Sequence, residues 1–255
     1  MIKLSHRGGG LITQKLTLPL GEVKKKAAFT LAEVLITLGI IGIVAAMTLP
    51  ALISNYQKHV YYNQFRKAAT ILENALQLYA VHNGCEGDIK DCFPNSDRLG
   101  YYTENPGFVD KFVEYFSVSQ KINSNNYADI CKNYEIKRGY DTEELYASGF
   151  NCCDNDKRIP STTHAFITSD GMLFNFSTDW GLAGASFVDV NGSTKGPNAY
   201  GRDVFLFYLD NNSKTGITWA GAEADSGFAS KNAVCTGVDG EGCAAKLLRD
   251  GKMDY

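Results

Sequence analysis

The hydrophobic residues are concentrated in one long run near the start of the chain. From Phe29 to Ile53 the sequence reads FTLAEVLITLGIIGIVAAMTLPALI and contains a single charged residue, Glu33. At 1.5 Å per residue, 25 helical residues extend over roughly 37 Å, and the hydrocarbon core of a bilayer is about 30 Å thick. The pattern therefore predicts that residues 29–53 form a helix that is apolar on all sides and can span a membrane.

Beyond Ile53 the hydrophobic positions continue, but they occupy only one face of a helix. Between residues 54 and 83 they recur at alternating spacings of three and four, which is typical of an amphipathic helix. They are Tyr61, Phe65, Ala68, Leu72, Ala75 or Leu76, and Tyr79. Asn83-Gly84 is a C-terminal stop signal, so we expect one helix from Phe29 to His82 whose second half packs on a soluble head.

Residues 84–255 are predicted to form that globular head, in two parts. Residues 84–160 are rich in cysteine, and the segment at 106–118 predicts a short helix. From 161 to 255, short β-branched or aromatic segments alternate with turn residues, and Ser169-Asp170-Gly171 lies between two of them as a hairpin turn. We expect four or five antiparallel strands in a meander that closes on the long helix, which is an α+β fold.

The distribution of charge narrows the interpretation of the apolar run. Residues 1–28 contain six basic side chains and one acidic side chain, although the whole chain has a net charge of −3. A basic segment before an apolar run keeps that end in the cytoplasm and directs the body across the membrane. Three explanations fit: a secretory signal peptide cut after Ala45-Ala46, a permanent signal anchor, or a prepilin that is cut before the run.

Glu33 favours the prepilin explanation. A carboxylate inside an apolar span costs several kcal/mol unless it is paired or protonated, so it usually has a function. A signal peptide gains nothing from such a residue. In a filament of identical helices, by contrast, the charge can pair with the new N-terminal amine of a neighbouring subunit.

The segment KKAAFTLAEVLITLGIIGIVAAMTLPALI resembles the cleavage and methylation segment of type IV pilins and type II secretion pseudopilins. The resemblance implies that a prepilin peptidase removes residues 1–28 by cutting between Ala28 and Phe29, and that Phe29 is then methylated. Glu33 becomes the fifth mature residue, and Pro50 lies where many members of the family kink this helix. One residue departs from the pattern, because the family usually has Gly where Ala28 stands, and slower processing is expected.

By the same resemblance, the chain is expected to be a subunit of a type IV pilus-like filament or a type II secretion pseudopilus. Its expected partners are other such subunits, the prepilin peptidase, the inner-membrane assembly machinery and inner-membrane lipid. It would cross the inner membrane once, with a periplasmic head, before joining a periplasmic or extracellular filament. Two alternatives stay open: a minor tip pilin that acts in adhesion or DNA uptake, and a signal-anchored exported protein of another function.

All seven cysteines follow the apolar run, in the part of the chain that would be exported to an oxidising compartment. Two pairs enclose short loops, Cys85 with Cys92 and Cys235 with Cys243, and these are the first candidates for disulfides. The adjacent Cys152 and Cys153 are expected to form separate bridges, one of them with Cys131. Because the number of cysteines is odd, at least one thiol has no partner within the chain.

Candidate chemistry in the head is limited to one patterned stretch, VDVNGSTKGPNAYGRDVF. Asp189, Asn191 and Asp203 are oxygen ligands of the kind that calcium prefers, and some pseudopilins bind calcium in this region. The alternative is that these residues only form turns. Otherwise no cofactor is expected, and no catalytic motif indicates an enzyme. The acidic head also argues against broad binding to DNA phosphates, so nucleic acid is not an expected partner.

Overall fold

The computed structural model describes residues 29–85, 89–92, 107–123, 126, 134–142, 163–177, 186–209, 213–222 and 234–255. The chain divides into two compact units, Met1–Leu49 and Pro50–Tyr255. The long helix α1, Leu31–His82, belongs to both units and runs through Pro50 without interruption. It ends where the sequence predicts, because Gly84 follows with a positive φ of 74° that a glycine adopts at little cost.

Among residues 29–49, the described part of the first unit, α1 packs against no other segment. Its large apolar side chains are all exposed, from Leu31 at 77% to Val34 at 41%. This part of the helix is long and apolar enough to cross a membrane.

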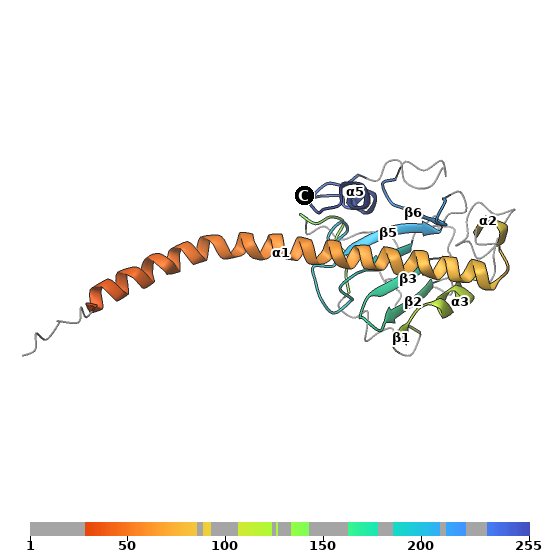
Figure 1. Cartoon of the computed structure of the whole chain (residues 1–255), viewed down its shortest axis with the longest axis horizontal. Helices are drawn as coiled ribbons and strands as arrows, with labels where there is room; N and C mark the ends of the chain where they lie inside the picture. Colours follow the sequence, from red (N-terminus) through yellow and green to blue (C-terminus); the bar gives the residue numbers. More distant parts are fainter. Residues whose placement is uncertain are drawn as a thin grey trace, which may run out of the picture. The chain divides into compact units, whose positions relative to one another are not determined.

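The second unit is built around one antiparallel sheet, which lies against the second half of α1 (Figure 1). The six strands follow one another in the order of the sequence, as expected for a meander. They are β1 (Val118–Lys121), β2 (Thr163–Thr168), β3 (Leu173–Ser177), β4 (Ser186–Asp189), β5 (Val204–Leu209) and β6 (Ile217–Trp219). The α+β fold class predicted from the sequence is therefore confirmed.

Both faces of the sheet are buried. One face packs on α1 through Phe166, Phe174 and Phe205, which join a core that includes Phe65 and Leu72 of the helix. The other face carries a second core, whose members include Tyr134, Leu173, Phe187, Tyr200 and Leu206. Strand β5 shows the alternation along one strand, because Phe205 and Phe207 face α1 while Val204 and Leu206 face the second core.

The turns that the sequence indicates are present. The hairpin between β2 and β3 turns at Gly171, whose φ is 86°, and Ile167 on one strand pairs with Leu173 on the other. Asp170 in this turn forms an ion pair of 2.6 Å with Lys67 on α1. The hairpin is thus tied to the helix at its tip as well as through its core-facing phenylalanines.

Several elements differ from the sequence prediction. The segment expected to be one helix at 106–118 forms α3 (Phe108–Phe112), a short 3₁₀ helix η1 (Val113–Tyr115) and then β1. The sheet is therefore not confined to residues 161–255, and it has six strands instead of four or five. Strand β1 was missed because it is a polar edge strand, mostly exposed, without the alternation that marks a half-buried strand. The helices α2 (Ile89–Cys92) and α5 (Cys243–Asp250) were not predicted either.

Both short-loop disulfides predicted from the sequence are formed. Cys85 bonds to Cys92 and so returns the chain to the end of α1. Cys235 bonds to Cys243, the first residue of α5. The predicted bridge from Cys131 to Cys152 or Cys153 lies outside the described residues.

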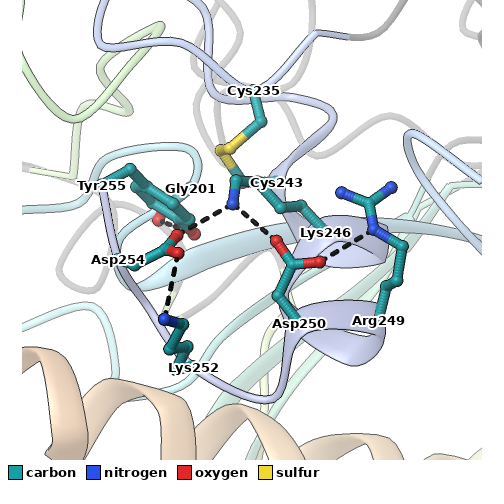
Figure 2. A network of polar contacts seen from close by, with 9 residues as sticks. All are labelled: Gly201, Cys235, Cys243, Lys246, Arg249, Asp250, Lys252, Asp254 and Tyr255. Carbon is teal, nitrogen blue, oxygen red and sulfur yellow. Dashed lines mark hydrogen bonds and ion pairs between the residues drawn. A yellow bond between two sulfur atoms is a disulfide. The ribbon is translucent and has the colours of Figure 1, made fainter.

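The C-terminal residues are held by a network of charges around α5 (Figure 2). Lys246 donates hydrogen bonds to Asp250 at 2.6 Å and to Asp254 at 2.8 Å. Tyr255 donates its hydroxyl proton to the carbonyl oxygen of Gly201 at 2.8 Å. The end of the chain is therefore fixed on the head, next to the disulfide of Cys235 and Cys243.

Candidate assembly segment and buried acidic pair

The first residues of α1 are stabilised by a reciprocal cap between Thr30 and Glu33. The carboxylate of Glu33 accepts hydrogen bonds from the backbone N–H and from the hydroxyl of Thr30, both at 2.8 Å. In return, the backbone N–H of Glu33 donates to the Thr30 hydroxyl oxygen at 3.2 Å. This is the capping-box arrangement, which satisfies N–H groups that a helix start would otherwise leave without partners. Glu33 therefore has a local structural role as well as a charge inside an apolar helix.

The helix that follows this cap exposes an apolar surface that water does not favour. Phe29 is 85% exposed and Met47 is 76% exposed, and the large apolar side chains between them are all exposed to a lesser or similar degree. Removing one large apolar side chain from water is worth about 1.5–3 kcal/mol, so covering this whole surface is worth on the order of tens of kcal/mol. Such a segment needs lipid or other apolar helices around it.

A comparison with known families identifies this region. Residues 23–49 match the family model of the prokaryotic N-terminal methylation motif. This motif marks prepilin segments of the type IV pilin and pseudopilin kind. Together with the apolar helix, it supports an exported protein of this type that is anchored in a membrane by a single pass. Searches of curated proteins and of solved structures gave no match.

The methylation motif includes Ala28, Phe29 and Glu33, the residues that the sequence proposes for cleavage, methylation and amine pairing. Ala28 lies outside the described residues, whereas Phe29 directly precedes the capped helix start. Pro50, the proposed kink, lies inside α1 and is the first residue of the second unit. The three proposed roles and the proposed kink stay predictions.

The structure brings together the three residues that the sequence proposes as calcium ligands. Asp189 ends β4, Asp203 precedes β5, and both carboxyl groups are fully buried. Asn191 lies between them in the connecting loop, and its side-chain NH₂ donates to Asp203 Oδ2 at 3.1 Å. These residues are neighbours because the ends of the antiparallel pair β4 and β5 meet where Asp189 pairs with Val204.

Most of these carboxylate oxygens already hold the loop in place. Asp189 Oδ1 accepts from the backbone N–H groups of Asn191 at 3.1 Å and Gly192 at 2.9 Å. Asp203 accepts from the backbone N–H groups of Asn198 at 2.9 Å and Ala199 at 2.8 Å. The turn interpretation of this stretch therefore has direct structural support.

Two oxygens of the cluster remain available to a cation. Asp189 Oδ2 and the side-chain oxygen of Asn191 accept no hydrogen bond of normal geometry among the described residues, although the Tyr134 hydroxyl interacts with Asp189 and lowers its pKa. Calcium usually takes six to eight oxygen ligands, so backbone carbonyls or water would have to supply the rest. Asp189 and Asn191 could supply two of the calcium ligands, whereas the oxygens of Asp203 already accept hydrogen bonds within the loop. Calcium therefore stays a proposal.

The buried pair also has an electrostatic consequence that the sequence did not reveal. Burial raises the pKa of Asp189, and the nearby charge of Asp203 raises it further. Burial likewise raises the pKa of Asp203, against the lowering effect of its backbone hydrogen bonds. Tyr134, from a segment far away in the sequence, also lies near this pair. Its pKa is raised mainly by burial and further by the charge of Asp189. Among the described residues, no basic side chain forms an ion pair with either aspartate.

Of the three basic residues in this region that could contact DNA, Lys132 lies outside the described residues, and Lys137 and Arg138 do not form one cluster. Arg138 lies 3.5 Å from Asp239, in an ion pair across the second unit. Lys137 lines a cleft of about 300 Å³ together with Tyr140 and Asp141. Lys137 and Arg138 therefore give no support to a DNA-binding surface.

Proposed function

We propose that this chain is the precursor of a pilin-type filament subunit, belonging either to a type IV pilus-like filament or to a type II secretion pseudopilus. A prepilin peptidase would cut between Ala28 and Phe29 and methylate the new N-terminus. The observation that carries the proposal is the methylation motif at residues 23–49, together with an apolar helix whose large side chains are exposed in the described part of the chain.

Before assembly, the subunit is held in the inner membrane with its head in the periplasm. The basic residues of 1–28 support this orientation, because lysines and arginines flanking an apolar span stay on the cytoplasmic side. The disulfides Cys85–Cys92 and Cys235–Cys243 are consistent with a head that folds in an oxidising compartment.

Assembly would then exchange lipid for neighbouring helices around the same apolar surface. Equivalent surfaces that stack head to tail without closing a ring build an open filament, which needs no new site on the head. Glu33 would pair with the methylated amine of Phe29 on a neighbouring subunit as that surface is buried. The proposed role is structural, and the motif and fold both support it.

The experiment is to determine the mature N-terminus of the full chain by mass spectrometry after expression with a prepilin peptidase. The expected product begins at N-methylated Phe29. Ala28→Gly restores the residue that the family usually carries and is expected to be cut at least as fast. Ala28→Lys should block the cut and accumulate precursor.

Two results would overturn the proposal. An intact Met1 in the presence of active peptidase would identify a permanent signal anchor. A product that begins just after Ala46 would identify an ordinary signal peptide. In either case the apolar segment would have no part in a filament.

A further inference from the structure

A pocket of about 370 Å³ lies within the second unit, between the start of its helix and the C-terminal loop. It is lined by Asn55, Lys58, His59, Tyr62 and Asn63 of α1 and by residues 251–253 of the loop. The helical residues are spaced three and four apart, so they share one face of α1. The pocket is thus a groove with a helical wall and a loop wall.

The loop wall depends on the turn after α5. Gly251 has a φ of 70° and caps α5, so the chain can reverse there at little conformational cost. A side-chain carbon at Gly251 would lie 3.8 Å from the hydroxyl of Tyr62, which shows how near the two walls come at this point. Lys252 follows directly and lines the groove opposite Lys58 and His59.

The charged side chains in the lining are both lysines, Lys58 and Lys252, and the lining includes no acid. Lys58 forms no ion pair with any residue that the structure describes. On the loop side, Asp250 pairs with Lys246 and Arg249, and Asp254 is held more closely by Lys246 than by Lys252 (Figure 2). Lys252 contacts Asp254 at 3.6 Å, the longest ion pair of that network. The groove therefore offers positive charge and amide donors to an anion.

The groove also begins where the apolar segment ends. Leu52 and Ile53 are 66% and 53% exposed, and Asn55 and Lys58 follow Ile53 by two and five residues. In a helix these steps rise about 3 and 7.5 Å. The headgroup layer on each side of a bilayer is roughly 5–7 Å thick. If lipid covers the helix up to Ile53, the backbone of Lys58 lies at the outer edge of the headgroup layer, and its long side chain can reach back to the phosphates.

An exposed tyrosine supports the same position of the helix relative to the membrane surface. Tyr56 is 68% exposed and lies between the apolar residues and Lys58. Tyrosine is enriched at the boundary between lipid and water, where its ring and its hydroxyl meet different surroundings. Lys58 can extend its apolar stem along the helix while its ammonium group stays among the phosphates.

We propose that this groove binds the phosphate group of an anionic phospholipid at the membrane surface. Lys58 and Lys252 would pair with the phosphate from opposite walls, and Asn55 and Asn63 would donate hydrogen bonds to its oxygens. The bound lipid would hold the head against the membrane until the subunit is extracted. This proposal requires the apolar segment to lie in a bilayer but does not require filament assembly.

The test uses the full chain in detergent micelles, with native mass spectrometry to count bound lipids. Short-chain phosphatidylglycerol is titrated against short-chain phosphatidylcholine, and inorganic phosphate is added as a competitor. Wild type is expected to retain one phosphatidylglycerol molecule more tightly than phosphatidylcholine. Each lysine near an anionic surface contributes roughly 1 kcal/mol, so Lys58→Gln with Lys252→Gln is expected to weaken that affinity about tenfold or more.

The control is Arg66→Gln, which removes a charge from the same helix outside the pocket and should leave the affinity unchanged. Near-ultraviolet circular dichroism verifies that each variant is folded. Equal retention of phosphatidylglycerol by wild type and the double variant would overturn the proposal. So would full displacement by inorganic phosphate, which would identify a free-anion site. A double variant that keeps the lipid but loses self-association would show that the groove contacts a second subunit instead.

Discussion

The carboxylate of Glu33 accepts both of its hydrogen bonds from one residue, Thr30, at 2.8 Å each. Both bonds go to the same oxygen, Oε2, and they use the backbone N–H and the hydroxyl of Thr30. The free subunit therefore gives this acid a partner inside its own helix start. Because Thr30 follows Phe29, the proposed cut leaves the cap intact. Capping and pairing with a neighbouring amine can therefore be separated by mutation.

The first prediction compares Glu33→Gln with Thr30→Val. The glutamine keeps an oxygen for the cap but loses the charge, and removing one member of a buried ion pair costs about 3–5 kcal/mol. Filament yield is expected to fall at least about tenfold, while membrane insertion is unchanged. The valine removes the cap hydroxyl but keeps the charge, and loss of a cap costs about 1 kcal/mol. Its filament yield should stay within about twofold of wild type.

The measurement is the amount of sheared or pelleted filament per cell, normalised to the subunit in the membrane fraction. Equal loss in the two variants would show that Glu33 acts through the cap alone. Normal filaments from Glu33→Gln would contradict the amine-pairing proposal altogether.

A second prediction concerns the contact between the helix and the sheet. Phe65 is fully buried, with its ring centroid 4.5 Å from that of Phe205 and 4.8 Å from that of Trp219. Phe65→Ala is expected to lower the free energy of unfolding by about 3–5 kcal/mol, since the contacts are lost and a cavity remains. Gln77→Ala, on the exposed face of the same helix, should change it by less than about 0.5 kcal/mol. Denaturant unfolding followed by tryptophan fluorescence measures both, and a loss below about 1 kcal/mol for Phe65→Ala would contradict the packing described here.

A third prediction follows from the raised pKa values of Asp189 and Asp203. A folded-state pKa above the unfolded value of about 4 means that the folded protein holds more protons. The pair therefore contributes to the stability of the folded state in acid. This contribution is lost as pH rises above about 4, through the raised pKa values of Asp189 and Asp203. Asp189→Asn should flatten the fall in stability over this range. Asp91→Asn, at an exposed position, should keep the wild-type slope, and an unchanged slope in Asp189→Asn would refute the prediction. Thermal unfolding at a series of pH values supplies the measurement.

A fourth prediction tests calcium at the same cluster. The pair gains negative charge as pH rises through the raised pKa values of about 6 for Asp203 and about 8 for Asp189, and above them a bound cation would neutralise it. Millimolar calcium is then expected to raise the unfolding temperature of wild type, with no such rise in Asp189→Asn. Magnesium is the control, because it demands a smaller and stricter ligand shell. A wild type whose unfolding temperature does not respond to calcium would contradict calcium binding at this pair.

Much of the fold was predictable from local pattern. The long helix, its end at His82, the hairpin turn at Gly171 and the antiparallel meander all came from the spacing of apolar and turn residues. Strand β1 and helix α5 were not predictable in this way. The first is a polar edge strand, and the second is an eight-residue helix whose placement involves a disulfide and the Lys246 network.

The candidate sites also differ in whether the sequence or the tertiary structure determined them. The sequence by itself determined the prepilin segment, because its length, its basic flank and its one carboxylate all lie in one continuous stretch of the chain. Only the tertiary structure decided that Asp189 and Asp203 are buried together, and that Lys58 faces Lys252 across a groove. Burial and pairing across the head depend on which distant segments meet, and the periodicity of one segment carries no information about its partner.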